Sequence, residues 1–112
     1  MPVIDKTTFE ELKQMSGGDF INELIDTFIE DSPNLIEEIK SALNGKNADS
    51  FRRAAHSMKS NAATFGAGHL SALAKELEML GKENKLHETG DRLRALEEAY
   101  DSVRRELEEL KS

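Results

Sequence analysis

The sequence predicts an all-α protein: an antiparallel, up-down four-helix bundle with a short additional helix at its N-terminus. Apolar residues recur at steps of three and four positions almost throughout the 112 residues, and no segment shows the alternation expected of a strand. Only two prolines occur, Pro2 and Pro33, and glycines separate most of the apolar stretches. Four long amphipathic segments joined by short loops favour antiparallel neighbours in a bundle.

The first predicted helix is short and covers roughly residues 8–15. Thr8 and Glu11 have the spacing of a capping box, in which the side chain of each residue accepts a hydrogen bond from the backbone amide of the other. Gly17 and Gly18 then end the helix. We expect this helix to act as a lid on the bundle.

The second predicted helix is long, from about residue 19 to residue 44, with Gly45 as its stop. Pro33 falls inside it, but the apolar phase holds across the proline, which favours one kinked helix over two. A proline there leaves the carbonyl of Ile29 without its usual amide partner. The expected core stripe consists of Ile21, Leu24, Ile25, Phe28, Leu35, Ile39 and Leu43.

The remaining helices follow at similar spacing. The third is expected from a cap at Asn47 or Asp49 to about Phe65, and its core stripe is Phe51, Ala54, Ala55, Met58, Ala62 and Phe65. The fourth starts near Ala67, carries Leu70, Leu73, Leu77 and Leu80, and fades through Gly81 and Asn84. The last is expected to carry Leu86, Gly90, Leu93, Leu96, Tyr100, Val103, Leu107 and Leu110 on one stripe.

Composition limits the class of protein. The net charge of −7 argues against a nucleic-acid binder, whose affinity depends on Lys and Arg at the phosphates. The absence of cysteine excludes disulfides and thiolate metal sites, and no apolar run approaches the length needed to cross a membrane. We expect a single domain over residues 1–112, monomeric and cytoplasmic.

One stretch departs from the acidic average. Residues 51–70 contain no Asp or Glu but include Arg52, Arg53, His56, Lys59 and His69. On a helical wheel His56 lies about 150° from the centre of the core stripe and therefore points to solvent. Its neighbours on that face are Arg52, Lys59, Ser60 and Ala63.

An exposed histidine with these neighbours suits phosphoryl transfer between proteins. With a reference pKa of about 6.5, imidazole is largely unprotonated and nucleophilic near neutral pH. Phosphoryl transfer needs mainly alignment and positive charge beside the equatorial oxygens, which Lys59 can supply. Small side chains at Ser60 and Ala63 let a partner approach. Arg52 and Arg53, and an apolar rim of Phe20 and Ile29 on the second helix, complete the expected partner-binding surface.

The motif around His56 resembles the signature of histidine-containing phosphotransfer (HPt) domains. It runs Ala55-His56-Ser57-Met58-Lys59-Ser60 and continues through Ala62-Ala63-Thr64-Phe65-Gly66-Ala67 to Leu70. The proline of the second helix, Gly45 before the motif helix and Leu77-Glu78 after it are also similar to the family pattern, so the resemblance covers essentially the whole chain. One departure is Ser60, where many members have glycine.

The resemblance implies a phosphorelay intermediary. His56 would accept a phosphoryl group from a receiver-domain aspartate or a sensor histidine kinase and pass it to another response-regulator receiver. Lys59 would be the assisting cation, and Gly66 the glycine that closes the motif helix. No cofactor or metal is expected on this chain, because Mg²⁺ would come with the receiver, and no autonomous kinase activity is expected.

Two other classes of function compete with this interpretation. A helical scaffold or dimerisation module would explain the periodicity but not the acid-free helix around His56. An enzyme using His56, such as a phosphatase, would need a second catalytic group and a phosphate-binding loop, and neither a Gly-rich loop nor an Arg cluster is present. The three histidines lack an i, i+4 pair, so a metal site is not expected, and His69 and His87 are interpreted as surface residues.

Overall fold

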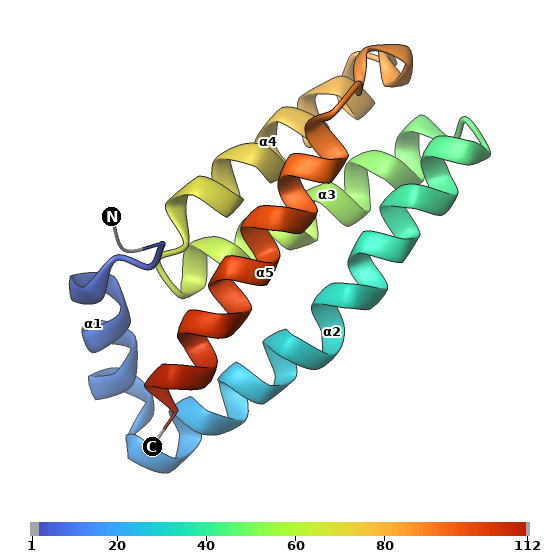
Figure 1. Cartoon of the computed structure of the whole chain (residues 1–112). Coiled ribbons are helices and arrows are strands. Elements are labelled where there is room, and N and C mark those ends of the chain that lie inside the picture. The colour runs from blue at the N-terminus through green and yellow to red at the C-terminus, as the bar shows by residue number, and fades with distance from the viewer. Residues whose placement is uncertain (1–2, 112) are drawn as a thin grey trace.

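Helices account for nearly all of residues 3–111, the part of the chain that the structure, a computed structural model, describes. The α-helices are α1 (Lys6–Ser16), α2 (Gly18–Asn44), α3 (Ala48–Thr64), α4 (Gly68–Lys82) and α5 (Arg92–Leu110), and a 3₁₀ turn, η1 (Leu86–Glu88), lies between α4 and α5. No strand occurs in this range. Helices α2 to α5 run side by side in alternating directions (Figure 1). The predicted fold class is confirmed.

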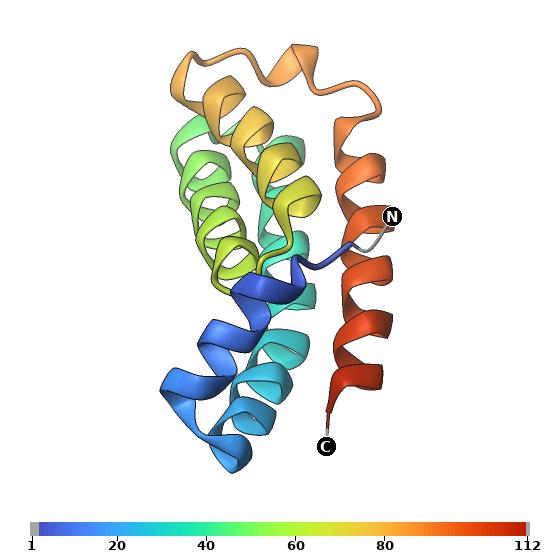
Figure 2. The same ribbon diagram turned by 90° about the vertical axis from the view of Figure 1, so that its left-hand side faces the viewer.

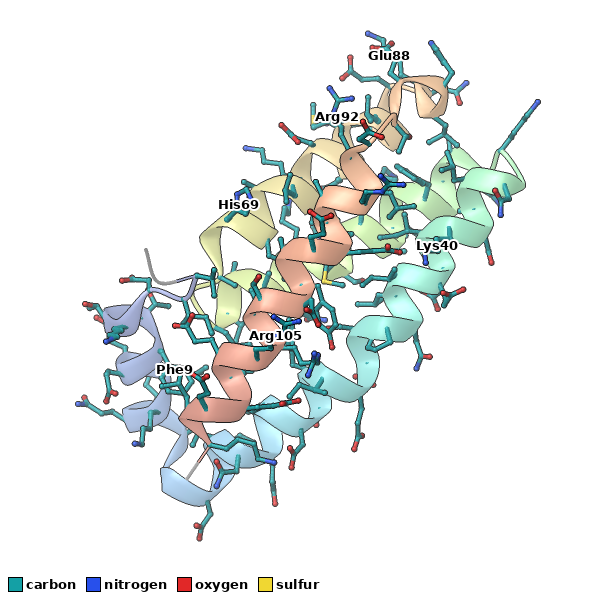
Figure 3. All side chains as sticks on the ribbon, viewed as in Figure 1. Phe9, Lys40, His69, Glu88, Arg92 and Arg105 are labelled. Carbon is teal, nitrogen blue, oxygen red and sulfur yellow. The ribbon has the colours of Figure 1, made fainter. Side chains whose placement is uncertain are left out.

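The short helix α1 covers one end of the bundle. It lies beside the N-terminal half of α2 and below the α3–α4 loop (Figure 2). Phe9 is buried on the bundle side of α1 (Figure 3), and the Asp5 amide donates to the Gly66 carbonyl at 2.9 Å. The predicted capping box at Thr8 is wrong: Asp5 occupies the N-cap and Thr8 donates its hydroxyl to the Asp5 carboxylate at 2.6 Å.

Helix α2 is continuous across Pro33, as predicted. Its buried face after the proline differs from the predicted stripe, because Ile36 rather than Leu35 points inward and Leu35 is only half-buried. At about 100° per residue, Ile36 lies about 20° around the helix from Ile25, whereas Leu35 lies about 80° from it. The whole buried face is Ile21, Ile25, Phe28, Ser32, Ile36, Ile39 and Ala42.

Helices α3 and α4 approach each other closely. Asn47 caps α3 by accepting the Ser50 amide at 3.0 Å, one of the two predicted cap positions, and the six predicted core residues of α3 are all buried. Helix α4 ends at Lys82, between Gly81 and Asn84, where the sequence predicted it to fade. Gly81 in its last turn is buried, and a Cβ there would lie 3.0 Å from the Arg52 Cα. The absent side chain is what lets the two backbones come together.

The last helix begins later than predicted. Leu86 belongs to η1, and Gly90 has φ +51° in the turn before α5, so neither extends the α5 stripe. Left-handed backbone of this kind is readily adopted by glycine and ends the regular helical phase.

Among residues 3–111, no helix is long and apolar enough to cross a membrane.

Candidate functional site

His56 lies at the middle of α3 on the outer face of the bundle. Its side chain is 54% exposed, whereas Ala55 and Met58 on the same helix are fully buried. Ser60 and Ala63, one and two turns further along, are exposed as well. The predicted helix phase is therefore confirmed, and the exposed side chains one and two turns beyond the imidazole are small.

The carboxylate of Glu78, on α4, connects the two candidate catalytic residues. Its Oε2 lies 2.6 Å from Nδ1 of His56, and its Oε1 lies 2.7 Å from Nζ of Lys59. The Glu78 side chain is only 15% exposed and that of Lys59 29%. Lys59 is thus held beside His56 by a carboxylate and is not a freely mobile charge.

Sequence reasoning did not assign this role to Glu78, which it noted only as part of the family pattern. The segment around His56 on α3 contains no acidic residue, and Glu78 is 22 positions away from His56 in sequence. The pairing follows from the contact between the antiparallel helices α3 and α4, which the sequence does not show. Gly81 packs on the first turn of α3, so the residue one turn earlier on α4 faces the residue one turn later on α3.

Glu78 carries a negative charge at neutral pH. The hydrogen bond from Lys59 lowers the pKa of the Glu78 carboxyl, with a further contribution from His56, while partial burial acts in the opposite direction. An ionised carboxylate accepts a hydrogen bond from the N–H group of Nδ1. A neutral imidazole carries one ring proton, so a proton held on Nδ1 leaves the other nitrogen bare. The favoured neutral tautomer of His56 therefore has an unprotonated, nucleophilic Nε2.

The basic stretch predicted from the sequence is largely neutralised in three dimensions. Arg52 donates to Asp49 Oδ1 at 2.9 Å, and Arg53 Nε lies 3.1 Å from Asp49 Oδ2. Asp49 stands just before the acid-free segment and one turn from both arginines, so their side chains turn toward the helix N-terminus. The expectation that Arg52 and Arg53 form a positive surface around His56 is not supported by these contacts.

A shallow depression beside His56 is walled by α2. Its lining consists of Asp31, Asn34, Leu35 and Glu38 from α2 and His56, Ser57, Ser60 and Asn61 from α3. It is open to solvent and therefore better suited to a protein surface than to an enclosed small molecule. In residues 3–111 no three His, Cys, Asp or Glu side chains are grouped to hold a metal ion.

The two predicted rim residues lie on different sides of α2. Phe20 is 50% exposed and shares the helical phase of Asp31, toward α3. Ile29 is half-buried against the core and about 120–180° around α2 from the residues that line the depression. Its carbonyl faces Tyr100 of α5, so the placement of Ile29 beside His56 was wrong.

The other predicted residues can be located in the same way. His87 is 76% exposed and 3.6 Å from Glu88, and His69 is exposed on α4 (Figure 3), about half a turn around the helix from Glu78. Neither joins the site. Gly66 has φ +78° after α3, and its amide and that of Ala67 bond the last carbonyls of the helix, as expected for a residue that closes it.

Comparison with known proteins connects this arrangement to characterised ones. The family model described as the Hpt domain matches residues 23–106. The phosphorelay protein LuxU of Vibrio harveyi is 28% identical over 88 residues, which cover 79% of this chain and 77% of LuxU. The crystal structure of histidine-containing phosphotransfer protein B (HptB) from Pseudomonas aeruginosa PAO1 is similar with a TM-score of 0.91 at 25% identity, covering 98% of this chain and 95% of that one.

Proposed function

The chain belongs to the Hpt domain family, and from that premise we propose that it is a phosphorelay intermediary that carries the phosphoryl group on Nε2 of His56. The observation that carries the assignment is the exposed imidazole whose Nδ1 lies 2.6 Å from an ionised carboxylate. His69 and His87 have no comparable arrangement of a lysine and a buried acid. We also propose that residues 1–112 act as one such domain.

In the proposed transfer, Nε2 of His56 attacks the phosphorus of a receiver's aspartyl phosphate. The N–P bond forms while the bond from phosphorus to the aspartate oxygen breaks, and the electron pair of that bond returns to the carboxylate. No proton has to leave His56, because Nε2 is unprotonated in the favoured tautomer. The imidazole becomes cationic as it gives up its lone pair, and the Glu78 carboxylate at Nδ1 stabilises that charge.

Lys59 is proposed to assist the phosphoryl group. Its ammonium lies 2.7 Å from Glu78, whose other oxygen bonds His56, so it stands within one side-chain length of the imidazole. A lysine has three donors, so Lys59 can keep one bond to Glu78 and offer another to an equatorial oxygen. Positioned charge of this kind lowers the barrier without reorganisation at the moment of transfer.

Partners are proposed from the shape of the surface. The depression beside His56 is open, and Ser60 and Ala63 leave room above α3, which fits a receiver domain. We propose receiver domains and a sensor histidine kinase as partners, with Mg²⁺ bound by the receiver rather than by this chain. The chain is proposed to have no kinase activity of its own.

Replacement of the acceptor tests the proposal. His56→Gln should abolish labelling by a phosphorylated receiver domain while leaving the helical circular dichroism unchanged. His69→Gln and His87→Gln are matched controls and should be labelled like the wild type. Label that survives in the His56 variant, or no label on the wild type with any receiver tested, would favour the helical scaffold instead.

A further inference from the structure

The proline of α2 leaves a carbonyl that another helix satisfies. Pro33 has no amide hydrogen, so the carbonyl of Ile29 lacks the donor that an α-helix normally places four residues later. The hydroxyl of Tyr100, on α5, donates to that carbonyl at 3.2 Å. Tyr100 is only 7% exposed, so water does not readily replace it. The Ser32 hydroxyl in the same turn is fully buried and makes no hydrogen bond within residues 3–111.

This hydrogen bond acts on the part of α2 that walls the depression beside His56. The α2 residues of that wall are Asp31, Asn34, Leu35 and Glu38, and they stand on both sides of Pro33 in the sequence. Ile29 lies about 120–180° around the helix from them, so Tyr100 holds α2 from the side opposite His56. A change in the course of α2 at the proline would move the wall relative to α3.

Contacts with α5 and with Lys111, the residue that follows it, hold α2 before and after the proline. Asp26 lies 2.6 Å from Lys111, and Lys40 lies 2.5 Å from Glu97. Lys40 projects from α2 on the side of α5 (Figure 3). Between these two ion pairs, Tyr100 contacts Phe28 with ring centroids 5.8 Å apart and bonds the carbonyl of Ile29. Helix α2 is therefore held before, beside and after Pro33, and Tyr100 makes the contact beside the proline.

We propose that Tyr100 is a positioning residue for phosphotransfer: its hydroxyl replaces the missing amide of Pro33 and keeps the α2 wall in place for the docking of a receiver domain. The part of the inference that concerns transfer rests on the proposed function of His56. The part that concerns the hydrogen bond does not.

A double-mutant cycle on Tyr100 and Pro33 tests the exchange of donors. Tyr100→Phe removes the hydroxyl and keeps the ring against Phe28. Pro33→Ala returns an amide that can bond the Ile29 carbonyl within the helix, so the hydroxyl becomes redundant in that background. Ser32→Ala is the matched control, because it removes a buried hydroxyl of the same turn that has no hydrogen bond.

The transfer assay uses a receiver domain charged with acetyl phosphate, chosen as the one that exchanges phosphoryl groups fastest with the wild type. Tyr100→Phe should lower kcat/KM by about two- to tenfold, the factor equivalent to one hydrogen bond, mainly through KM. Direct labelling of His56 by acetyl phosphate should not change, and Ser32→Ala should match the wild type. In the Pro33→Ala background the Tyr100 substitution should change kcat/KM by less than about twofold.

Amide hydrogen exchange of residues 31–38 separates this inference from the proposed function. Exchange there should accelerate in Tyr100→Phe and return to the wild-type rate in the double variant, whether or not His56 is the acceptor. Equal losses of kcat/KM in both backgrounds, or unchanged exchange and transfer in Tyr100→Phe, would overturn the role of Tyr100. If hydrogen exchange accelerates in Tyr100→Phe and recovers in the double variant, but His56 is never labelled, only the proposed phosphotransfer function is refuted.

Discussion

Replacing Glu78 with alanine removes the acceptor of the His56 Nδ1 proton and, in the same step, the ionic partner of Lys59. Both contacts are short, 2.6 Å and 2.7 Å, and Glu78 itself is 15% exposed. A hydrogen bond to a charged group is worth about 1.5–3 kcal/mol. Because His56 is 54% exposed, we expect the lower end of that range, which corresponds to roughly tenfold slower transfer from a phosphorylated receiver.

The tautomer of His56 gives a direct spectroscopic test of the reason for that loss. In the wild type, ¹⁵N shifts of the ring should show the proton on Nδ1 and a bare Nε2, and in Glu78→Ala the two tautomers should mix. Lys59→Ala is the matched control, because it removes the other contact of Glu78 and leaves the bond to His56. A wild-type transfer rate in Glu78→Ala, or an unchanged tautomer, would refute the role of the carboxylate.

The same contacts make a pH-dependent contribution to stability. Lys59, followed by His56, lowers the pKa of Glu78 below its ordinary value of 4.5. A carboxyl whose pKa is depressed in the folded state stabilises that state above its ordinary pKa, and the stabilisation disappears as the pH falls through the lowered value. The free energy of unfolding should therefore differ more between wild type and Glu78→Ala at neutral pH than in acid, which denaturant titrations at both pH values would measure.

Three further predictions concern neighbouring positions. Lys59→Ala should lower the transfer rate, measured by stopped flow, more than it lowers receiver affinity, measured by calorimetry. A loss of affinity with an unchanged transfer rate would contradict this. Ala63→Trp should fold normally and block transfer from a receiver while sparing labelling by acetyl phosphate, since the ring would keep a docked receiver from the imidazole. Gly81→Ala should cost about 1–3 kcal/mol of unfolding free energy, because its Cβ would lie 3.0 Å from the α3 backbone, whereas Gly68→Ala has open space and should cost far less.

Local sequence pattern was sufficient to predict the helices and the exposure of His56. Apolar steps of three and four residues predicted each long helix, and Asn47 was among the predicted caps. The same steps placed Met58 in the core and His56 in solvent, both of which the structure confirms. These features depend on neighbours within a turn or two, so a single helix already contains the information.

Helix boundaries were less predictable where tertiary contacts compete with local signals. Thr8 looked like a cap, but the contact of Asp5 with Gly66 of the α3–α4 loop starts α1 earlier. Gly81 and Gly90 are the same residue type, yet one is buried where two helices touch and the other forms a left-handed turn. A glycine alone does not reveal which of its two uses applies.

The electrostatics of the site were decided by tertiary structure. The sequence determined which charges flank His56 along α3, and from these a positive surface was expected. The packing of α4 against α3 instead brings Glu78 between His56 and Lys59, and the fold brings Tyr100 to the carbonyl that Pro33 leaves free. Charge and hydrogen-bond pairing extend over only a few ångströms, so these partners are set by which helix faces meet in space, and residues far apart in the chain provide them.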